Sequence, residues 1–210
     1  MNDIFGQIPP VNPKNCICHS GGASGSDTLW ETITEHYGGT TKAYSYKTDY
    51  HKSKNKIEIS EEDFQEGIEE VRKANKIMNR YGIQKVMKLL SRDWAQVKYS
   101  NQIIAIGHIV QPGEHGKKGF PSNATQAVVD GGTGYAVTMG IIHEKPVFVY
   151  EQDEKKWYRW SYNTKNFIEV LPDNVYLIHH HFAGIGTRDI NSDGEKAILH
   201  VFTNTLSRCT

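Results

Sequence analysis

The sequence has few cysteines and no excess of charge of either sign. Its 210 residues include three cysteines, Cys16, Cys18 and Cys209, and an odd number in a chain of this length does not predict a disulfide framework. Lys and Arg number 24 together, and so do Asp and Glu. Because duplex nucleic acid requires a basic surface, this balance makes a nucleic-acid partner unexpected.

Signals for a membrane, a cofactor or a metal are also missing from the sequence. No window approaches about 18 consecutive apolar residues, and residues 1–15 carry no signal-peptide pattern. Cys16 and Cys18 have the wrong spacing for a zinc site, and His179–His181 have no carboxylate beside them in a recognisable motif. We therefore expect a cytoplasmic protein that uses no membrane, no metal and no cofactor.

What the sequence does contain is an alternation of short apolar strands and amphipathic helices. Residues 1–15, with three prolines, predict an extended leader, and 16–210 a single Rossmann-like domain. Strands are predicted at 16–19, 40–46, 101–110, 145–152, 155–162 and 175–188. Helices are predicted at about 27–37, 60–80, 83–97, 124–130, 133–143 and 192–207. This pattern predicts an α/β fold with a mostly parallel sheet, helices on both faces, and a short antiparallel addition near 145–162.

A polar segment and two helix starts complete the local predictions. The polar, Lys-rich segment 47–59 has no apolar face, so it is either a solvated loop or a lid that closes on a phosphate. Asp27 stands where a helix N-cap is expected, and Ser60 begins a capping box.

Three loops, at 19–27, 130–136 and 182–189, follow strands and precede helices. Glycine lets a ligand approach the backbone closely, and the free amides and the dipole of a helix start favour an anion. Parallel strands bring such loops to one edge of the sheet. The predicted ligand-binding residues are Ser20, Gly21, Gly22, Ala23, Ser24, Gly25, Ser26, Gly107, His108, Gly131, Gly132, Thr133, Gly134, Tyr135, Gly184, Gly186, Thr187 and Arg188.

Known nucleotide fingerprints do not match these loops. The stretch GGASGS lacks the GxGxxG register of dinucleotide-binding proteins, and no GxxxxGK followed by Ser or Thr occurs. A phosphate-binding loop of the NTPase type is therefore excluded.

Two longer stretches resemble a known superfamily. SGGASGSDTLWE and DGGTGYAVTMGIIHEKPVFVYEQ look like the two ligand-binding stretches of the SLOG superfamily, and AGIGTRDINSDGEKAI resembles a stretch of its phage-type members. The resemblance covers most of residues 16–207. It implies a Rossmann-like domain that binds a nucleotide or a nucleotide-derived small molecule across the first two loops, and by analogy senses or sequesters a nucleotide signal. A homo-oligomer is also expected.

The alternative that the resemblance suggests is an enzyme that cleaves an N-glycosidic bond, as the LOG phosphoribohydrolases and the nucleoside deoxyribosyltransferases do. The LOG pattern GGxGTxxE, laid on Gly131–Gly134, puts Tyr135 at its Thr and Thr138 at its catalytic Glu. A threonine cannot replace that carboxylate. An enzyme would therefore need Asp27, Glu31 or Asp130 as its catalytic acid.

Overall fold

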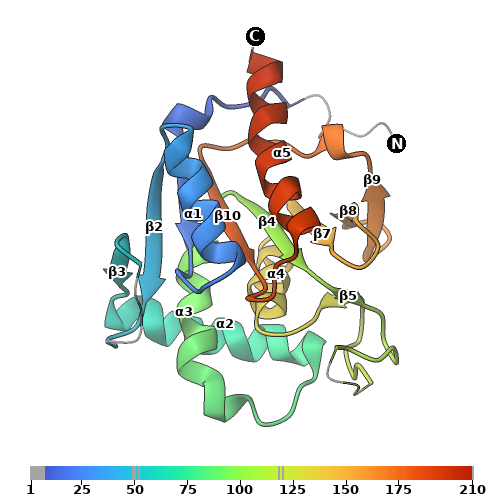
Figure 1. The fold of residues 1–210 in the computed structure, drawn as a ribbon. Coiled ribbons are helices and arrows are strands. Elements are labelled where there is room, and N and C mark those ends of the chain that lie inside the picture. The colour runs from blue at the N-terminus through green and yellow to red at the C-terminus, as the bar shows by residue number, and fades with distance from the viewer. Residues whose placement is uncertain (1–7, 49–50, 52, 118, 120, 210) are drawn as a thin grey trace.

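A central eight-stranded sheet organises the chain (Figure 1). The computed structural model describes residues 8–48, 51, 53–117, 119 and 121–209. The strand order is β3-β2-β1-β10-β4-β7-β8-β9. The strands are β1 (Ile17–Ser20), β2 (Thr40–Ser45), β3 (Lys56–Glu58), β4 (Gln102–Gly107), β7 (Val147–Glu151), β8 (Lys156–Ser161), β9 (Asn166–Val170) and β10 (His181–Gly186). The pairs from β3 to β7 are parallel, which confirms the predicted fold class.

The antiparallel addition predicted near 145–162 is also present, and it is longer than expected. β8 pairs antiparallel with β7, and β9 pairs antiparallel with β8. A separate two-stranded antiparallel sheet joins β5 (Ile109–Val110) to β6 (Val128–Val129).

Helices cover both faces of the sheet (Figure 1). α1 (Ser26–His36) and α5 (Ser192–Cys209) lie on one face, and α2 (Glu61–Met78), α3 (Met87–Lys98) and α4 (Thr133–Ile142) on the other. Short 3-10 helices are η2 (Pro13–Asn15), η3 (Ile83–Val86) and η4 (Pro172–Asn174). Among the described residues, no helix is long and apolar enough to cross a membrane.

The continuous apolar run of β4 results from burial on both faces. Ile103 and Ala105 belong to the core beneath α2, α3 and α4, whereas Ile104 and Ile106 belong to the core beneath α1 and α5. A central parallel strand has no solvated face, so its side chains need not alternate between apolar and polar.

The two predicted helix caps have different outcomes. The Ser60 hydroxyl accepts a hydrogen bond from the Asp63 amide at 3.0 Å, which confirms that Ser60 caps α2. The prediction for Asp27 is wrong, because Gly25 occupies the N-cap position of α1 and Asp27 lies inside the first turn. The Asp27 side chain is therefore free for other contacts.

Three predicted segments differ from the structure. Residues 175–180 are not a strand, because side chains bind their backbone: the Leu177 amide donates to Thr205 Oγ1 and the Ile178 amide to Gln102 Oε1, both at 3.0 Å. The helix predicted at 124–130 is also wrong, since this stretch ends in β6. Within the predicted loop 47–59, β3 forms a short edge strand parallel to β2.

The predicted leader is partly ordered against the domain. The Val11 amide donates to the Leu177 carbonyl at 3.0 Å, and η2 follows it. Residues 1–7 lie outside the described part of the chain.

Candidate functional site

A pocket of about 1010 Å³ lies at the carboxyl ends of β1, β10 and β4. Ala23 and Asp27 follow β1, Gly107 and His108 end β4, and 186–189 end β10. From β1 the chain continues to β2 on one side of the sheet, and from β4 it continues to β7 on the other side. The pocket therefore lies where the strand order changes direction. Ligands of open α/β sheets bind at this position.

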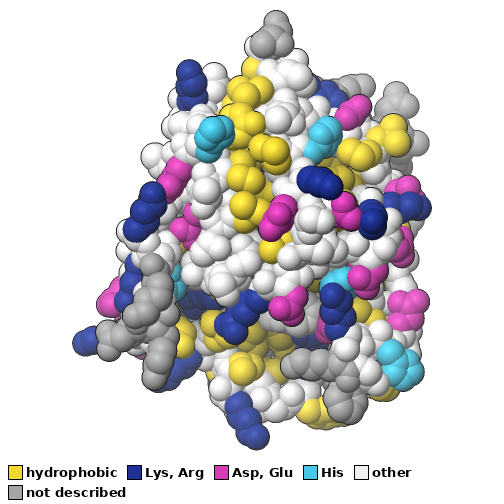
Figure 2. Space-filling model, viewed as in Figure 1, with side chains coloured by type: hydrophobic (Ala, Val, Ile, Leu, Met, Phe, Trp, Pro, Cys, Tyr) yellow, Lys and Arg dark blue, Asp and Glu magenta, His cyan; other side chains and the backbone are white. Residues whose placement is uncertain are grey.

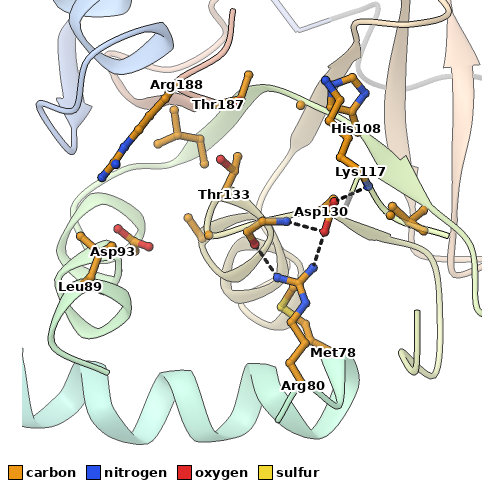
Figure 3. A pocket seen from close by; sticks show the side chains of 18 of the residues that line it. Met78, Arg80, Leu89, Asp93, His108, Lys117, Asp130, Thr133, Thr187 and Arg188 are labelled. Carbon is orange, nitrogen blue, oxygen red and sulfur yellow. Dashed lines mark hydrogen bonds and ion pairs between the residues drawn. The ribbon is translucent and has the colours of Figure 1, made fainter. Parts of the chain in front are cut away.

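The remaining walls come from α3, from the end of α2, from the loop between β5 and β6, and from the start of α4. Their lining residues include Met78, Arg80, Leu89, Arg92, Asp93, Gln96, Lys117, Asp130, Gly131, Gly132 and Thr133. Figure 3 shows Asp93 and Arg188 on one side of the pocket, Asp130 with Arg80 on the other, and Thr133 and Thr187 between them. In the space-filling view, basic, acidic and apolar side chains adjoin one another in the lower part of the face, below α1 and α5 (Figure 2).

The first glycine loop is filled by the protein's own groups. A β-carbon on Gly21 would lie 1.7 Å from Arg92 Nη1, one on Gly22 would lie 2.3 Å from the His51 ring, and one on Gly25 would lie 2.4 Å from the Arg188 carbonyl oxygen. These glycines therefore admit neighbouring protein atoms, and among the predicted loop residues 20–26 Ala23 is the one that lines the pocket.

Two serines of this loop form hydrogen bonds within the protein, and the third lies outside the pocket lining. The Ser20 hydroxyl donates to Glu31 Oε1 at 2.8 Å, and the Ser26 hydroxyl donates to the Thr187 carbonyl at 2.8 Å. Ser24 is not among the lining residues.

The second loop is open to the pocket. A β-carbon on Gly131 or Gly132 would meet no described atom within 4 Å, and both residues line the pocket with Thr133. Gly132 holds the N-cap position of α4, and no described side chain caps this helix. Gly134 and Tyr135 have packing roles instead: a β-carbon on Gly134 would lie 1.9 Å from the Val129 carbonyl, and the buried Tyr135 hydroxyl lies 2.7 Å from Asn75 Oδ1.

The third loop contributes three of its four predicted residues. Gly186, Thr187 and Arg188 line the pocket, and no described residue forms an ion pair with the exposed Arg188 guanidinium. Gly184 lies within β10 beneath Trp30, where a β-carbon would be 2.6 Å from the indole ring. The missing side chain of Gly184 therefore lets α1 pack closely on β10.

The three candidate catalytic carboxylates occupy different environments. Asp27 lines the pocket and is 6% exposed; burial raises the pKa of its carboxyl to about 7, with Asp93 adding to the shift and Arg92 opposing it. Asp130 also lines the pocket, where it accepts from the Gly131 amide at 2.7 Å and pairs with Arg80 at 3.4 Å.

Glu31 stands apart from the pocket. Its oxygens accept from the hydroxyls of Ser20 and Ser53 at 2.8 and 2.6 Å, and from the Asn55 amide at 3.2 Å. It ties the Lys-rich segment to α1 and is not a lining residue.

Sequence reasoning missed Arg92, Asp93 and Gln96, which are buried in α3 and line the pocket. Arg92 Nη2 lies 3.4 Å from Asp93 Oδ1, which also accepts from Gln96 Nε2 at 3.0 Å. Burial raises the pKa of the Asp93 carboxyl to about 6, against the effect of Arg92. Charged and polar residues of an amphipathic helix are expected on its solvated face, so the one signal these residues gave was a pair of adjacent charges, Arg92 and Asp93.

A cluster beside the pocket combines possible metal ligands. His108 Nδ1 lies 2.9 Å from Glu151 Oε1 and 3.2 Å from Asp153 Oδ2, and the three ligand atoms lie within 4.8 Å of one another. Gln152 Oε1 accepts from the Asn191 amide, so Gln152 presents its Nε2 to His108 Nε2 at 3.4 Å. His108 Nδ1 is thus within hydrogen-bond distance of Glu151, and the Asp153 amide donates to Glu151 Oε1 at 3.1 Å, which ties the cluster together.

Comparison with protein-family models, with curated proteins and with solved structures yields no match to this chain. The SLOG resemblance therefore rests on the sequence motifs alone. Because a fold hosts many functions, the function has to be inferred from the chemistry of the pocket.

Proposed function

We propose that the chain binds a nucleotide or a nucleotide-derived small molecule in this pocket, with the phosphate at the start of α4. A volume of about 1010 Å³ is at the upper end of ordinary small-molecule sites. The observation that carries the proposal is the open space at the start of α4, where Gly131 and Gly132 line the pocket. The Asp130 carboxylate already accepts from the Gly131 amide, so an anion would bind to the amides that follow it. Backbone amides and the helix dipole favour an anion at such a place.

Two cations border the pocket, on opposite sides. Lys117 and Arg188 line the pocket, and neither side chain forms an ion pair with a described residue. Lys117 lies beside Asp130, next to the start of α4, whereas Arg188, whose planar fork of donors matches a phosphate, lies on the side of Asp93 (Figure 3). The first glycine loop is a weaker candidate for the phosphate, because Arg92 and His51 already occupy the space beside its glycines.

The pocket also has apolar surface that suits the flat face of a base. Met78, Leu89, Val110, Ala136 and Ile185 contribute to its lining. A ligand with a charged group at one end and an apolar ring elsewhere matches this mixture. Sensing or sequestering a nucleotide signal requires this binding and no catalytic group.

A matched pair of variants at Gly132 tests the proposal. Gly132 has φ −63° and open space beside it, so Gly132→Asp and Gly132→Asn are both expected to fold. The aspartate carboxylate would occupy the anion position, so Gly132→Asp should lose binding of AMP, ADP-ribose or NAD in calorimetric titration. Gly132→Asn should lose much less. Wild-type protein that binds none of these ligands at millimolar concentration would overturn the proposal.

An enzyme that cleaves an N-glycosidic bond is the second candidate, and Asp27 favours it. Its carboxyl lines the pocket, and burial raises its pKa to about 7, so a protonated fraction persists at neutral pH. Such a group is suited to protonate a departing base. Chromatography after incubation with AMP should then reveal free adenine, abolished in Asp27→Asn and retained in Glu31→Gln. No free base from the wild type contradicts this candidate alone.

A further inference from the structure

The end of the pocket next to α3, formed by Asp27, Arg92, Asp93 and Gln96, differs chemically from the start of α4. We call these four residues the α3 end. All four are less than 9% exposed and line the pocket. Arg92 and Asp27 approach each other beneath Gly21, where one added β-carbon would lie 1.7 Å from Arg92 Nη1 and 2.6 Å from Asp27 Oδ2.

The hydrogen bonding of the α3 end is incomplete. A guanidinium has five N–H donors, yet Arg92 makes one ion pair, at 3.4 Å to Asp93. Within the described part of the chain, Arg92 Nη1 and Gln96 Oε1 have no hydrogen-bond partner although both atoms are buried. Buried polar atoms without partners are costly, and they mark places where a bound molecule completes the network.

The group that completes this network must both donate and accept. Arg92 offers donors, Gln96 Oε1 is an acceptor, and the carboxyls of Asp27 and Asp93 accept when ionised. A fully ionised phosphate group only accepts, and it would face two carboxyl groups whose ionised forms repel it. A hydroxyl group donates to a carboxylate and accepts from a guanidinium at once.

We infer that the α3 end binds the hydroxyl groups of a sugar ring, and that the ligand therefore lies with its sugar against α3 and its phosphate at the start of α4. This inference rests on the proposed function and adds an orientation to it. Asp93 of the α3 end and Asp130, which precedes α4, lie on opposite sides of the pocket, and Thr133, the first residue of α4, lies between them (Figure 3). A site built to hydrogen-bond hydroxyl groups rejects a ligand that lacks them.

Calorimetric titration of the full chain with ribose 5-phosphate and with inorganic phosphate tests the inference. Wild-type protein should bind ribose 5-phosphate more tightly than phosphate. Asp93→Asn, which keeps the shape of the side chain, and Arg92→Gln should each weaken ribose 5-phosphate binding by about ten- to hundredfold and leave phosphate binding unchanged. Gly132→Asp should weaken both. Thermal unfolding verifies that each variant is folded, and Asp93→Asn alone decides if Arg92→Gln does not fold.

The two proposals fail in different ways. Equal affinity of the wild type for the two probes, or an unchanged affinity for ribose 5-phosphate in Asp93→Asn, overturns the sugar orientation. Neither result contradicts the proposal that the pocket binds a nucleotide. Loss of phosphate binding in Arg92→Gln, with a folded protein, makes Arg92 the phosphate ligand and also overturns the orientation. Binding of neither probe, together with no binding of AMP, overturns both proposals.

Discussion

Asp27 Oδ1 accepts a hydrogen bond from the backbone amide of Gly186 at 3.1 Å, which joins the first turn of α1 to the end of β10. Oδ2 of the same carboxyl accepts from the Ala23 amide at 3.4 Å. One buried side chain thus holds the first and third loops together at the edge of the sheet. Burial, opposed by Arg92, raises the pKa of this carboxyl to about 7.

The raised pKa of Asp27 predicts how stability depends on pH. The folded state holds a proton up to about pH 7, whereas an unfolded aspartate releases it near 3.8, so the free energy of unfolding falls as pH rises between these values. Asn in place of Asp27 has no proton to lose. The stability of Asp27→Asn relative to wild type should therefore rise by up to about 4 kcal/mol from pH 4 to pH 8.

Urea unfolding at several pH values measures this difference. Asp93 also has a raised pKa, of about 6, so Asp93→Asn should give a smaller change that ends at lower pH. A stability difference between Asp27→Asn and wild type that does not vary with pH would show that the Asp27 carboxyl is ionised throughout.

His19 predicts a pH dependence of opposite sign. Its ring is buried between Tyr44 and His181, at 2.9 Å from each, and burial lowers its pKa to about 3. Below pH 6.5 His19 binds a proton in the unfolded state, but in the folded state it stays neutral down to about pH 3. The free energy of unfolding therefore falls as pH falls from 6.5 towards 3. His19→Gln should lose less stability than wild type between pH 7 and pH 4, by about 3 kcal/mol. Parallel acid-induced unfolding curves for the two proteins would contradict this.

Two glycines of one loop should respond differently to alanine. A β-carbon on Gly134 would lie 1.9 Å from the Val129 carbonyl oxygen, whereas one on Gly132 would meet no described atom within 4 Å. We expect Gly134→Ala to lower the free energy of unfolding by about 1–3 kcal/mol because the helix must move away from β6. Gly132→Ala should be neutral or stabilising. Thermal melting compares them, and equal melting temperatures would refute the packing role of Gly134.

Glu31 is expected to support structure and not binding. Its oxygens accept hydrogen bonds from Ser20, Ser53 and Asn55, and it lies outside the pocket lining. Glu31→Gln should cost about 1–3 kcal/mol of stability and speed amide exchange in residues 53–58, with AMP affinity unchanged. A folded Glu31→Gln protein of normal stability that has lost AMP binding would place Glu31 in the binding machinery after all.

Most local elements could be predicted, because local periodicity and caps reflect interactions between near neighbours. The run 101–110 predicted a strand buried on both faces, which β4 confirms over Gln102–Gly107, whereas Ile109–Val110 turn away and form β5 of the second sheet. Ser60 predicted the start of α2. The failures have a common cause. At 175–180, Thr205 and Gln102 bind the backbone that a neighbouring strand was expected to bind. Those partners are distant in sequence, so no local pattern reveals them.

By itself, the sequence determined the α/β class, the buried central strand and the loops at the edge of the sheet, since period and glycine position act locally. Only the tertiary structure decided which loop is open. It inserts β10 between β1 and β4, fills the space beside Gly21 with Arg92, and leaves Gly132 facing the pocket. It also buries Arg92 and Asp93, whose charges predict a solvated surface. The physical reason is that these outcomes depend on packing between distant segments.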